Sequence, residues 1–281
     1  MSDSARSVPD WVTALARRAR TVDGAPPFSD QSLVDYRTGA RELVVEGHDA
    51  AALVSATDAE FVVDPDARGR GRGTRLLENL LATGVTTFWA HGDAPAARAL
   101  AASHRLRPVR ELLHFVGEVS TSSTRVGDSI HPRLELHPRL ELVETFVPNE
   151  DEQEWVALNA VIFADHPEQG SVTLADLQQL ETEPWFSADN FLVLRRDGRM
   201  IGYCWLKVED DRGEFYAVGV SPDHHGEKLG SLLFDAGLAR LRELGIHSSH
   251  LYVEADNEAA LHLYHSRGFV QDAVDIQYRL H

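Results

Sequence analysis

The chain has 281 residues, enough for one large domain or two of ordinary size, and 43% of them are hydrophobic and 25% are charged. Its formal net charge of −17 argues against nucleic acid or an anionic membrane as a partner, since both would repel an acidic surface. The sequence has no apolar run of about 18 residues, no apolar N-terminal signal and no cysteine besides Cys204. These absences exclude a transmembrane helix and an internal disulfide, and they predict a cytoplasmic protein.

Two helices and a strand are predicted at the start of the chain. Residues 11–20 have the spacing of an amphipathic helix, and residues 31–47 predict a helix that runs into a strand. Asp30 follows Ser29 at the expected N-cap of the second helix. From these residues alone, Asp30 is a capping or first-turn acid that complements the helix dipole.

Residues 59–81 predict a strand, an Asp-Pro turn, a glycine-rich basic loop and a helix, in that order. The loop is the sequence RGRGRG at residues 68–73. In isolation such a run would predict a flexible basic loop. A loop that leads from a strand into a helix, however, directs backbone N–H groups toward one point, which suits a phosphate.

The same order of elements recurs in residues 214–231, EFYAVGVSPDHHGEKLGS. Val63 corresponds to Val220, so the repeat has a spacing of about 157 residues, which indicates two duplicated domains. Period-2 alternation predicts four side chains on one face of the second strand: Glu214, Tyr216, Val218 and Val220. A carboxylate therefore stands on the strand that leads into the second loop.

The repeat extends through residues 86–115 and 249–280, which each predict a strand, a turn, a helix and a final strand. WAHGDAPAARAL and YVEADNEAALHL align without gaps, with Asp93 opposite Asp256. Between the halves, HPRLEL occurs twice after a Ser/Thr-rich connector. No further ligand completes a set with its histidines, so no metal site is predicted.

Residues 190–210 predict two strands joined by Asp197-Gly198, which is the turn chemistry of a hairpin. Cys204 lies among apolar neighbours in the second of these strands. No histidine or basic partner for a thiolate is apparent, so we predict that Cys204 packs in the core.

Both halves resemble the GNAT acetyltransferase superfamily, whose loop signature Q/R-x-x-G-x-G/A lies between a strand and a helix. In the first half the signature is met fully by Arg68, Gly71 and Gly73. In the second half the equivalent positions are His225, Lys228 and Gly230. Only the last glycine of the signature is therefore kept there.

The end of the second half, Tyr264-x-x-x-Gly268-Phe269, is typical of a GNAT domain. The first half has His104 and Leu106 in that region and no tyrosine. By this resemblance, the first half has a cofactor-binding fold without a catalytic acid.

The resemblance implies an α+β (α/β mixed) fold of two tandem GNAT domains, each a mixed, mostly antiparallel sheet flanked by helices. Residues 1–120 would form an N-terminal domain that is non-catalytic. This domain looks shortened between Glu42 and Glu60, where a two-stranded hairpin is expected. Residues 121–140 would be a linker and residues 141–281 the catalytic domain.

Four further motifs resemble the mycothiol synthase family: HPEQG at 166–170, EPWF at 183–186, WLKV at 205–208 and LYVEADN at 251–257. Their common order makes the resemblance specific, and it covers nearly the whole chain. In this family the acetyl group of acetyl-CoA passes to the cysteinyl amine of Cys-GlcN-Ins, giving mycothiol and CoA. The resemblance implies acetyl-CoA as cosubstrate, this small-molecule substrate, no metal and a monomer.

The functional positions of the family can be carried over to this sequence. Glu214 resembles the general base and Tyr264 the general acid. The implied substrate contacts are Asp30, Glu168, Lys207, Glu214 and Tyr252. The implied acetyl-CoA contacts of the catalytic domain are Val218, Gly219, Val220, His225, Gly226, Glu227, Lys228, Leu229, Gly230, Ser231, Asn257, Glu258, Ala259, Ala260, Leu261 and His262. A second, non-catalytic acetyl-CoA site in the first domain is implied at Phe61, Val62, Val63, Arg68, Gly69, Arg70, Gly71, Arg72 and Gly73.

These residue types suit direct acetyl transfer. The attacking amine is an ammonium ion at neutral pH and must lose a proton, which Glu214 can accept directly or through a water. A backbone N–H near Val218 can stabilise the oxyanion, and Tyr264 can protonate the departing thiolate. No covalent enzyme intermediate is needed, so Cys204 has no role. We expect the Lys228 side chain to point outward or to pair with a phosphate.

Other interpretations stay open from the sequence. Glu214 could be an exposed edge residue, Tyr264 a core aromatic and Lys207 part of a solvated face. The chain could also acetylate another amine, such as an aminoglycoside or a protein terminus, or it could be a non-catalytic acetyl-CoA-binding regulator. The pair of Glu214 and Tyr264 argues against the regulator, and the four motifs favour mycothiol synthesis over another amine.

Overall fold

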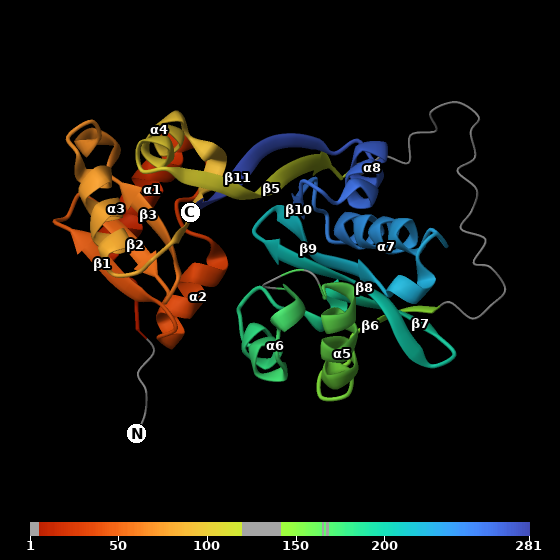
Figure 1. Ribbon diagram of the computed structural model, residues 1–281. Coiled ribbons are helices and arrows are strands. Elements are labelled where there is room, and N and C mark those ends of the chain that lie inside the picture. The colour runs from red at the N-terminus through yellow and green to blue at the C-terminus, as the bar shows by residue number, and fades with distance from the viewer. Residues whose placement is uncertain (1–5, 120–141, 165, 167–168) are drawn as a thin grey trace, which may run out of the picture. The chain divides into compact units, whose positions relative to one another are not determined.

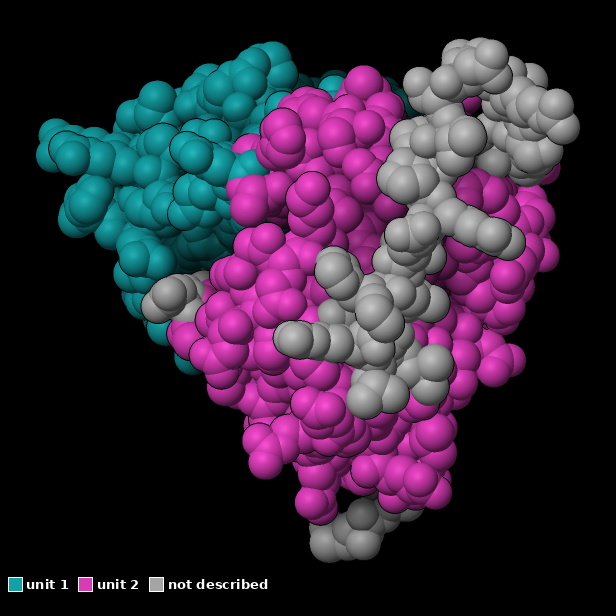
Figure 2. Space-filling view, turned by 90° about the vertical axis from the view of Figure 1, so that its right-hand side faces the viewer, with its two compact units in different colours: residues 1–114, 253–258, 271–281 teal, residues 115–252, 259–270 magenta. Residues whose placement is uncertain are grey.

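A computed structural model describes residues 6–119, 142–164, 166 and 169–281 (Figure 1). The predicted linker 121–140, with the two HPRLEL histidines, and the predicted substrate residue Glu168 lie outside the described residues. The chain divides into two compact units that interleave along the sequence (Figure 2). Unit 1 contains residues 1–114, 253–258 and 271–281, and unit 2 contains residues 115–252 and 259–270. The boundaries of the two tandem domains stay a prediction.

Unit 1 combines helices with a mixed sheet. Its helices are α1 (Asp10–Asp23), α2 (Asp30–Thr38), α3 (Arg72–Ala82) and α4 (Pro95–Ser103). Its strands are β1 (Glu42–Glu46), β2 (Ala50–Val54), β3 (Asp58–Val63), β4 (Thr87–Ala90), most of β5 (Leu106–Glu118) and β11 (Val270–Leu280). They lie in the order β1-β2-β3-β4-β11-β5. Strands β3 and β4 are parallel, whereas the β1–β2, β2–β3 and β4–β11 pairs are antiparallel.

The hairpin that the sequence predicted to be missing from unit 1 is present. Strand β1 pairs with β2 from Glu42 opposite Val54 to Glu46 opposite Ala50, and β2 pairs in turn with β3. The β1–β2 turn takes only residues 47–49, and Gly47 has a φ of 64° there. Because the left-handed region makes such a tight turn possible, the short sequence between Glu42 and Glu60 accommodates both connections.

Strand β2 lies in the interior of unit 1 and has apolar side chains on both faces. Ala50 and Ala52 belong to the core cluster that contains the leucines of α3, whereas Ala51 and Leu53 belong to the cluster that contains the apolar side chains of α1. All four side chains are fully buried. Successive side chains of a strand face opposite sides, so a continuously apolar strand is covered by helices on both faces.

Unit 2 has a sheet in the order β6-β7-β8-β9-β10. Its strands are β6 (Leu142–Thr145), β7 (Phe191–Arg196), β8 (Arg199–Glu209), β9 (Arg212–Val220) and most of β10 (Ser248–Glu254). Its helices are α5 (Glu152–Ile162), α6 (Leu174–Leu180), α7 (Leu229–Glu243) and most of α8 (Glu258–Ser266). Only the β9–β10 pair is parallel among the pairs of this order. The predicted fold class, a mixed and mostly antiparallel sheet flanked by helices, is confirmed.

Strand β8 separates the two cores of unit 2. Tyr203 and Trp205 pack against Trp155 of α5, with ring centroids 5.4 and 5.8 Å away. Cys204 points to the other face, where its Sγ would be 2.8 Å from a Cβ added at Gly237 of α7. The predicted packing role of Cys204 is confirmed: its side chain is fully buried, and burial raises the pKa of the thiol.

Two searches of the described residues gave no group. No helix there is long and apolar enough to cross a membrane. No cluster of three or more His, Cys, Asp or Glu side chains there could hold a metal ion.

Candidate active site

Strand β9 contains a β-bulge at Tyr216, which decides where the side chains of this strand point. Trp205 of β8 lies opposite Ala217, but Leu206 lies opposite Phe215, so Tyr216 is an extra residue in the ladder. An extra residue reverses the alternation of faces beyond it.

The prediction that Glu214 shares a face with Val218 and Val220 is therefore wrong. Glu214 lies opposite Lys207, on the face that Trp205 presents to α5, whereas Val218 lies opposite Cys204, on the face that packs against α7. Tyr216 stays on the side of Glu214, since its ring is 5.1 Å from that of Trp205. Simple alternation fails because the sequence gives no signal for the bulge.

Glu214 lies between two titratable side chains on the neighbouring strands. Lys207 of β8 and His250 of β10 are its direct Cα partners. The Nε2 atom of His250 is 3.6 Å from Oε2 of Glu214, and only 15% of the Glu214 side chain is exposed. We call Lys207, Glu214 and His250 the carboxylate row. Glu214 is thus a mostly buried residue of the central sheet rather than an exposed edge residue.

Lys207 is also buried, so the interpretation as a solvated face is wrong for it. Its side chain is 6% exposed, and its Nζ lies 3.0 Å from Oε2 of Glu209. The ammonium group stands 5.4 Å from the ring centroid of Trp185, the tryptophan of the EPWF motif. Tyr252, two residues after His250 on β10, is 40% exposed, with its ring 6.4 Å from that of His250.

The parallel ladder between β9 and β10 ends at Phe215, one residue before the bulge. It runs from Ser248 opposite Arg212 to Leu251 opposite Phe215. The backbone of β9 from Tyr216 to Val220 is outside this ladder. Separated parallel strands leave backbone groups that can pair with an extended ligand.

The loop after β9 ends in a left-handed residue that begins α7. Lys228 is the N-cap, with φ 62° and ψ 20°, and Gly71 is the N-cap of α3, with φ 72° and ψ 9°. Neither cap has a side-chain hydrogen bond, so the first N–H groups of both helices are directed toward an anion. Lys228 keeps the backbone of the signature glycine at a conformational cost of about 1 kcal/mol.

An ion cluster holds this loop to β7. Arg196 donates a hydrogen bond of 2.9 Å to Glu227, and His224 lies 3.0 Å from each of the two. The hydrogen bonds from Arg196 and His224 lower the pKa of Glu227 to about 2. The Glu227 side chain therefore anchors the loop, which leaves its backbone for any contact with acetyl-CoA.

Tyr264 lies on α8 within an aromatic cluster. Its side chain is 8% exposed, and the rings of Phe234, Phe115 and Phe269 surround it at 5.1, 6.4 and 6.5 Å. Burial raises the pKa of its phenol, and Cys204 adds to this effect. The phenol is therefore protonated at neutral pH. Tyr264 is a core aromatic that also keeps a proton to donate.

The other predicted substrate and cofactor residues divide between the units. Asp30 is the first residue of α2 in unit 1, and Ser29 is confirmed as the cap, since its hydroxyl accepts from the N–H of Ser32. Lys207, Glu214 and Tyr252 belong to unit 2. Of the predicted α8 contacts, Asn257 and Glu258 belong to unit 1, and the remaining ones, Ala259, Ala260, Leu261 and His262, belong to unit 2.

Unit 1 has a cavity of about 460 Å³ beyond the point where β3 and β4 separate. Their parallel ladder ends at Glu60 opposite Trp89. Eight of the nine residues predicted for the second acetyl-CoA site line the cavity, namely Phe61, Val62, Val63, Arg68, Gly69, Gly71, Arg72 and Gly73. The exposed Arg70 does not. A cavity of this size lies in the range of small-molecule sites.

The loop arginines of unit 1 already have acidic partners, which the sequence did not indicate. Arg68 donates two hydrogen bonds of 2.7 Å to Asp23, and Arg72 lies 3.0 Å from Asp49. A phosphate in this loop would compete with these carboxylates for the guanidinium groups.

Unit 1 also contains a buried cluster of Glu60, His91 and Asp275, which we call the buried triad. His91 Nδ1 lies 2.8 Å from Asp275, and Nε2 lies 3.5 Å from Glu60. Burial by itself would lower the pKa of His91, but the two carboxylates outweigh it and raise this pKa to about 10. Burial would likewise raise the pKa of Glu60, which His91 and Ser29 instead lower to about 2.

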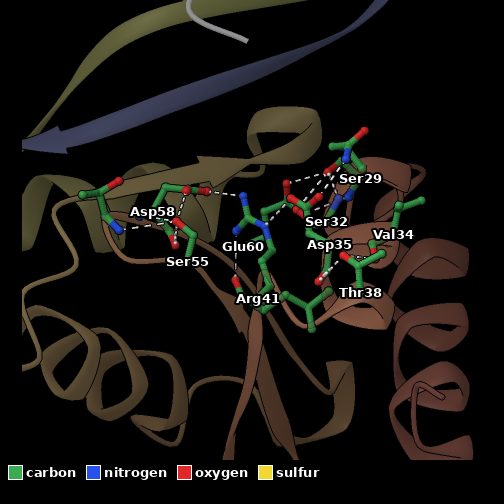
Figure 3. Close-up of polar contacts among 12 residues, drawn as sticks. Ser29, Ser32, Val34, Asp35, Thr38, Arg41, Ser55, Asp58 and Glu60 are labelled. Atoms are coloured by element: carbon green, nitrogen blue, oxygen red, sulfur yellow. Dashed lines mark hydrogen bonds and ion pairs between the residues drawn. The ribbon is translucent and has the colours of Figure 1, made fainter. Parts of the chain in front are cut away.

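The hydrogen bonds around Glu60 connect α2 with the sheet (Figure 3). The N–H and the hydroxyl of Ser29 each donate to the Glu60 carboxylate over 2.7 Å. Asp275 is far from Glu60 and His91 in sequence, so no local motif could have found the triad. Glu60 has no freely accessible lone pair of a general base.

Comparison with known proteins places the chain in a family. A model of the acetyltransferase (GNAT) family matches residues 155–269. Mycothiol acetyltransferase from Sanguibacter keddieii is 43% identical over 95% of this chain and 91% of its own length, and that from Thermobispora bispora is 42% identical over 95% and 94%.

Solved structures share the fold at low identity. A GCN5-related N-acetyltransferase from Sphaerobacter thermophilus has a TM-score of 0.71 at 20% identity and covers 100% of this chain and 96% of its own. A tandem GNAT protein from the clavulanic acid biosynthesis pathway has a TM-score of 0.68 at 18% identity, with 96% and 94% covered. Together with the sequence relatives, these findings show that the chain belongs to the mycothiol acetyltransferase family of GNAT acetyltransferases.

Proposed function

We propose that this chain transfers the acetyl group of acetyl-CoA to the cysteinyl amine of Cys-GlcN-Ins, giving mycothiol and CoA. One observation carries the proposal: Glu214 is a mostly buried carboxylate on the strand that leads into the left-handed N-cap at Lys228. A potential base and an anion-binding helix start therefore belong to one strand-loop-helix segment. The named activity of the relatives supplies the substrate.

Glu214 is the proposed general base. The cysteinyl amine is an ammonium ion near neutral pH, and an N–H bond must break before its lone pair can attack. The proton passes to the Glu214 carboxylate, directly or through a water. The nitrogen then bonds to the thioester carbonyl carbon, and the bond from that carbon to the CoA sulfur breaks.

The charges that develop during this transfer have proposed donors in unit 2. The backbone N–H of Val218, beyond the bulge, stabilises the oxyanion of the tetrahedral intermediate. The protonated phenol of Tyr264 donates to the departing CoA thiolate. The buried thiol of Cys204, with its raised pKa, takes no part.

The sugar and inositol of the substrate offer mainly hydroxyl groups, which need paired polar groups to be recognised specifically. Lys207 and Tyr252 lie in or beside the carboxylate row and are proposed contacts. Asp30 and Glu168 complete the proposed set.

Acetyl-CoA is proposed to bind unit 2 through the loop and helix start at residues 225–231, together with residues 218–220 and 257–262. The backbone N–H groups before α7 suit its pyrophosphate. The left-handed backbone of Lys228 leaves this amide cradle in the same form as at Gly71. The Lys228 ammonium is proposed to pair with a phosphate.

The cavity of unit 1 is proposed to hold a second acetyl-CoA that is not a substrate for catalysis. Its lining matches the predicted contacts, including the signature glycines Gly71 and Gly73. Glu60, the carboxylate of β3, is held by Ser29 and His91, and its pKa of about 2 makes it a weak base. We further propose that the protein is a cytoplasmic monomer.

The experiment that tests this function is CoA release with purified full-length protein. Cys-GlcN-Ins should release CoA in the presence of acetyl-CoA, whereas GlcN-Ins, which lacks the cysteine, should not. Equal rates with both would favour acetylation of another amine. Binding of acetyl-CoA without release from either substrate would favour a regulator.

A further inference from the structure

We propose that His250 is a positioning residue for the base: it orients the Glu214 carboxylate and takes up the proton that Glu214 removes from the substrate ammonium. The inference rests on the proposed function, because it requires Glu214 to act as the base. His250 directly precedes the LYVEADN motif and belongs to none of the four motifs.

The first argument is the register of the sheet. His250 and Glu214 are direct partners in the parallel β9–β10 ladder, one step before the bulge region, so their side chains lie on the same face. The Nε2–Oε2 distance of 3.6 Å is an ion-pair distance. A ladder on both sides of Glu214 fixes its backbone, and the imidazole lies against one carboxylate oxygen.

The second argument is the other flank of the carboxylate row. The Lys207 ammonium lies 3.0 Å from Glu209 and stacks on Trp185, so another carboxylate and an aromatic ring hold it. Lys207 can supply positive charge next to Glu214, but a lysine ammonium has no lone pair to receive a proton. A neutral imidazole has one.

The third argument is the comparison between the repeats. The repeat aligns Glu214 with Thr57 and His250 with Thr87, and the backbone N–H of Thr87 donates to the carbonyl of Thr57 over 3.1 Å. The half without a proposed catalytic role therefore lacks the carboxylate and the imidazole together. This joint replacement is expected if the two side chains act as a pair.

The proton transfer closes a cycle. An N–H bond of the ammonium breaks as an O–H bond forms on Glu214. That O–H bond then breaks as an N–H bond forms on Nε2 of His250, which restores the carboxylate. The imidazolium finally gives its proton to water, with which its 17% exposed side chain is in contact.

Steady-state kinetics of the full-length protein test this role with His250→Leu, His250→Gln and Glu214→Gln, alone and combined. We expect His250→Leu to lower kcat about 10-fold, a typical share of general-base catalysis, with KM for acetyl-CoA changed less than about twofold. His250→Gln can donate a hydrogen bond but cannot take the proton, so we expect a smaller loss. In the Glu214→Gln background, His250→Leu should cause no further loss.

Two results would overturn the inference alone: wild-type kcat in both His250 variants, or the same fold loss from His250→Leu with and without Glu214. If His250→Leu does not fold, the Glu214→Gln cycle is run with His250→Gln, and the same criteria apply. Full activity of Glu214→Gln would overturn the proposed base and this inference together.

A matched control is available in unit 1. His104 lies 3.6 Å from Glu78, the same distance as between His250 and Glu214, and its side chain is 15% exposed. His104→Leu therefore removes a histidine–carboxylate pair of equal spacing away from the carboxylate row. We expect it to keep wild-type kcat, so that a loss specific to His250 reports on the base rather than on the removal of an ion pair.

Discussion

The strand-loop-helix segments of the two units, β3 to α3 and β9 to α7, have similar backbones but different chemistry. Both parallel ladders end before the loop, and both helices begin at a left-handed N-cap. In unit 1 the carboxylate on the strand, Glu60, is enclosed by Ser29 and His91. In unit 2 Glu214 stands in a row with Lys207 and His250.

This difference shows that anion binding and base chemistry depend on separate parts of the segment. The amide cradle is a backbone property, so Lys228 can replace the glycine at a modest conformational cost. The reactivity of a carboxylate depends on its side-chain neighbours, which differ completely between the units. The half with the complete loop signature is thus the half without a usable base.

The largest effect is expected from Glu214→Gln. Removing the base should lower kcat about 1000-fold, or about 4 kcal/mol of transition-state stabilisation, and leave acetyl-CoA affinity unchanged. Kinetics and calorimetric titration with acetyl-CoA measure the two quantities. The comparison variant Glu60→Gln should keep kcat per folded molecule. Comparable losses from both variants would contradict the functional difference between the units.

His91→Leu should destabilise unit 1 by about 3 kcal/mol, because two buried carboxylates lose the cation between them. Urea unfolding of the full chain measures this loss. His104→Leu, whose partner Glu78 has a side chain that is 59% exposed, should cost less than about 1 kcal/mol. Equal effects would mean that the triad is no stronger than a surface pair.

The stabilisation by the buried triad should depend on pH in a defined window. His91 has a raised folded pKa of about 10, so its contribution is complete below its ordinary value of 6.5 and is lost as the pH rises toward 10. Glu60 has a lowered pKa of about 2, so its contribution is complete above 4.5 and is lost as the pH falls toward 2. The difference in unfolding free energy between wild type and His91→Leu should be greatest between pH 4.5 and 6.5. A difference that grows from pH 7 to 10 would refute the charged triad.

Lys228→Gly should convert the second loop into the form of the first. The backbone strain is relieved, but a phosphate contact is lost, so KM for acetyl-CoA should rise about 5-fold, or about 1 kcal/mol. Lys228→Arg retains the charge and should stay near wild type. An unchanged KM in Lys228→Gly would show that the lysine points outward.

The smallest effect is expected from Asp23→Asn. Loss of the carboxylate frees Arg68 for a phosphate, so acetyl-CoA affinity at the unit 1 site should increase about 3-fold in calorimetric titrations. Asp235→Asn breaks a comparable two-bond contact with Arg267 in unit 2 and should leave that affinity unchanged. A weaker unit 1 site in Asp23→Asn would indicate that Asp23 shapes the loop instead of competing for it.

Much of the candidate site could be predicted from the sequence because its signals are local. The Asp197-Gly198 hairpin, the Ser29 cap and both loop-helix segments depend on neighbouring residues, and the structure has them where the sequence predicts them. The β1–β2 hairpin was missed because its turn is unusually short for the sequence signals it carries.

The sequence by itself determined the repeat, the two anion-binding loops and the family, because each is a property of residue order. The tertiary structure decided which side chains meet. The bulge at Tyr216 separates Glu214 from Val218, the β9–β10 register brings His250 to Glu214, and the fold brings Asp275 to His91. Register and bulges depend on the packing of strands that are distant in the chain, so no local pattern specifies them.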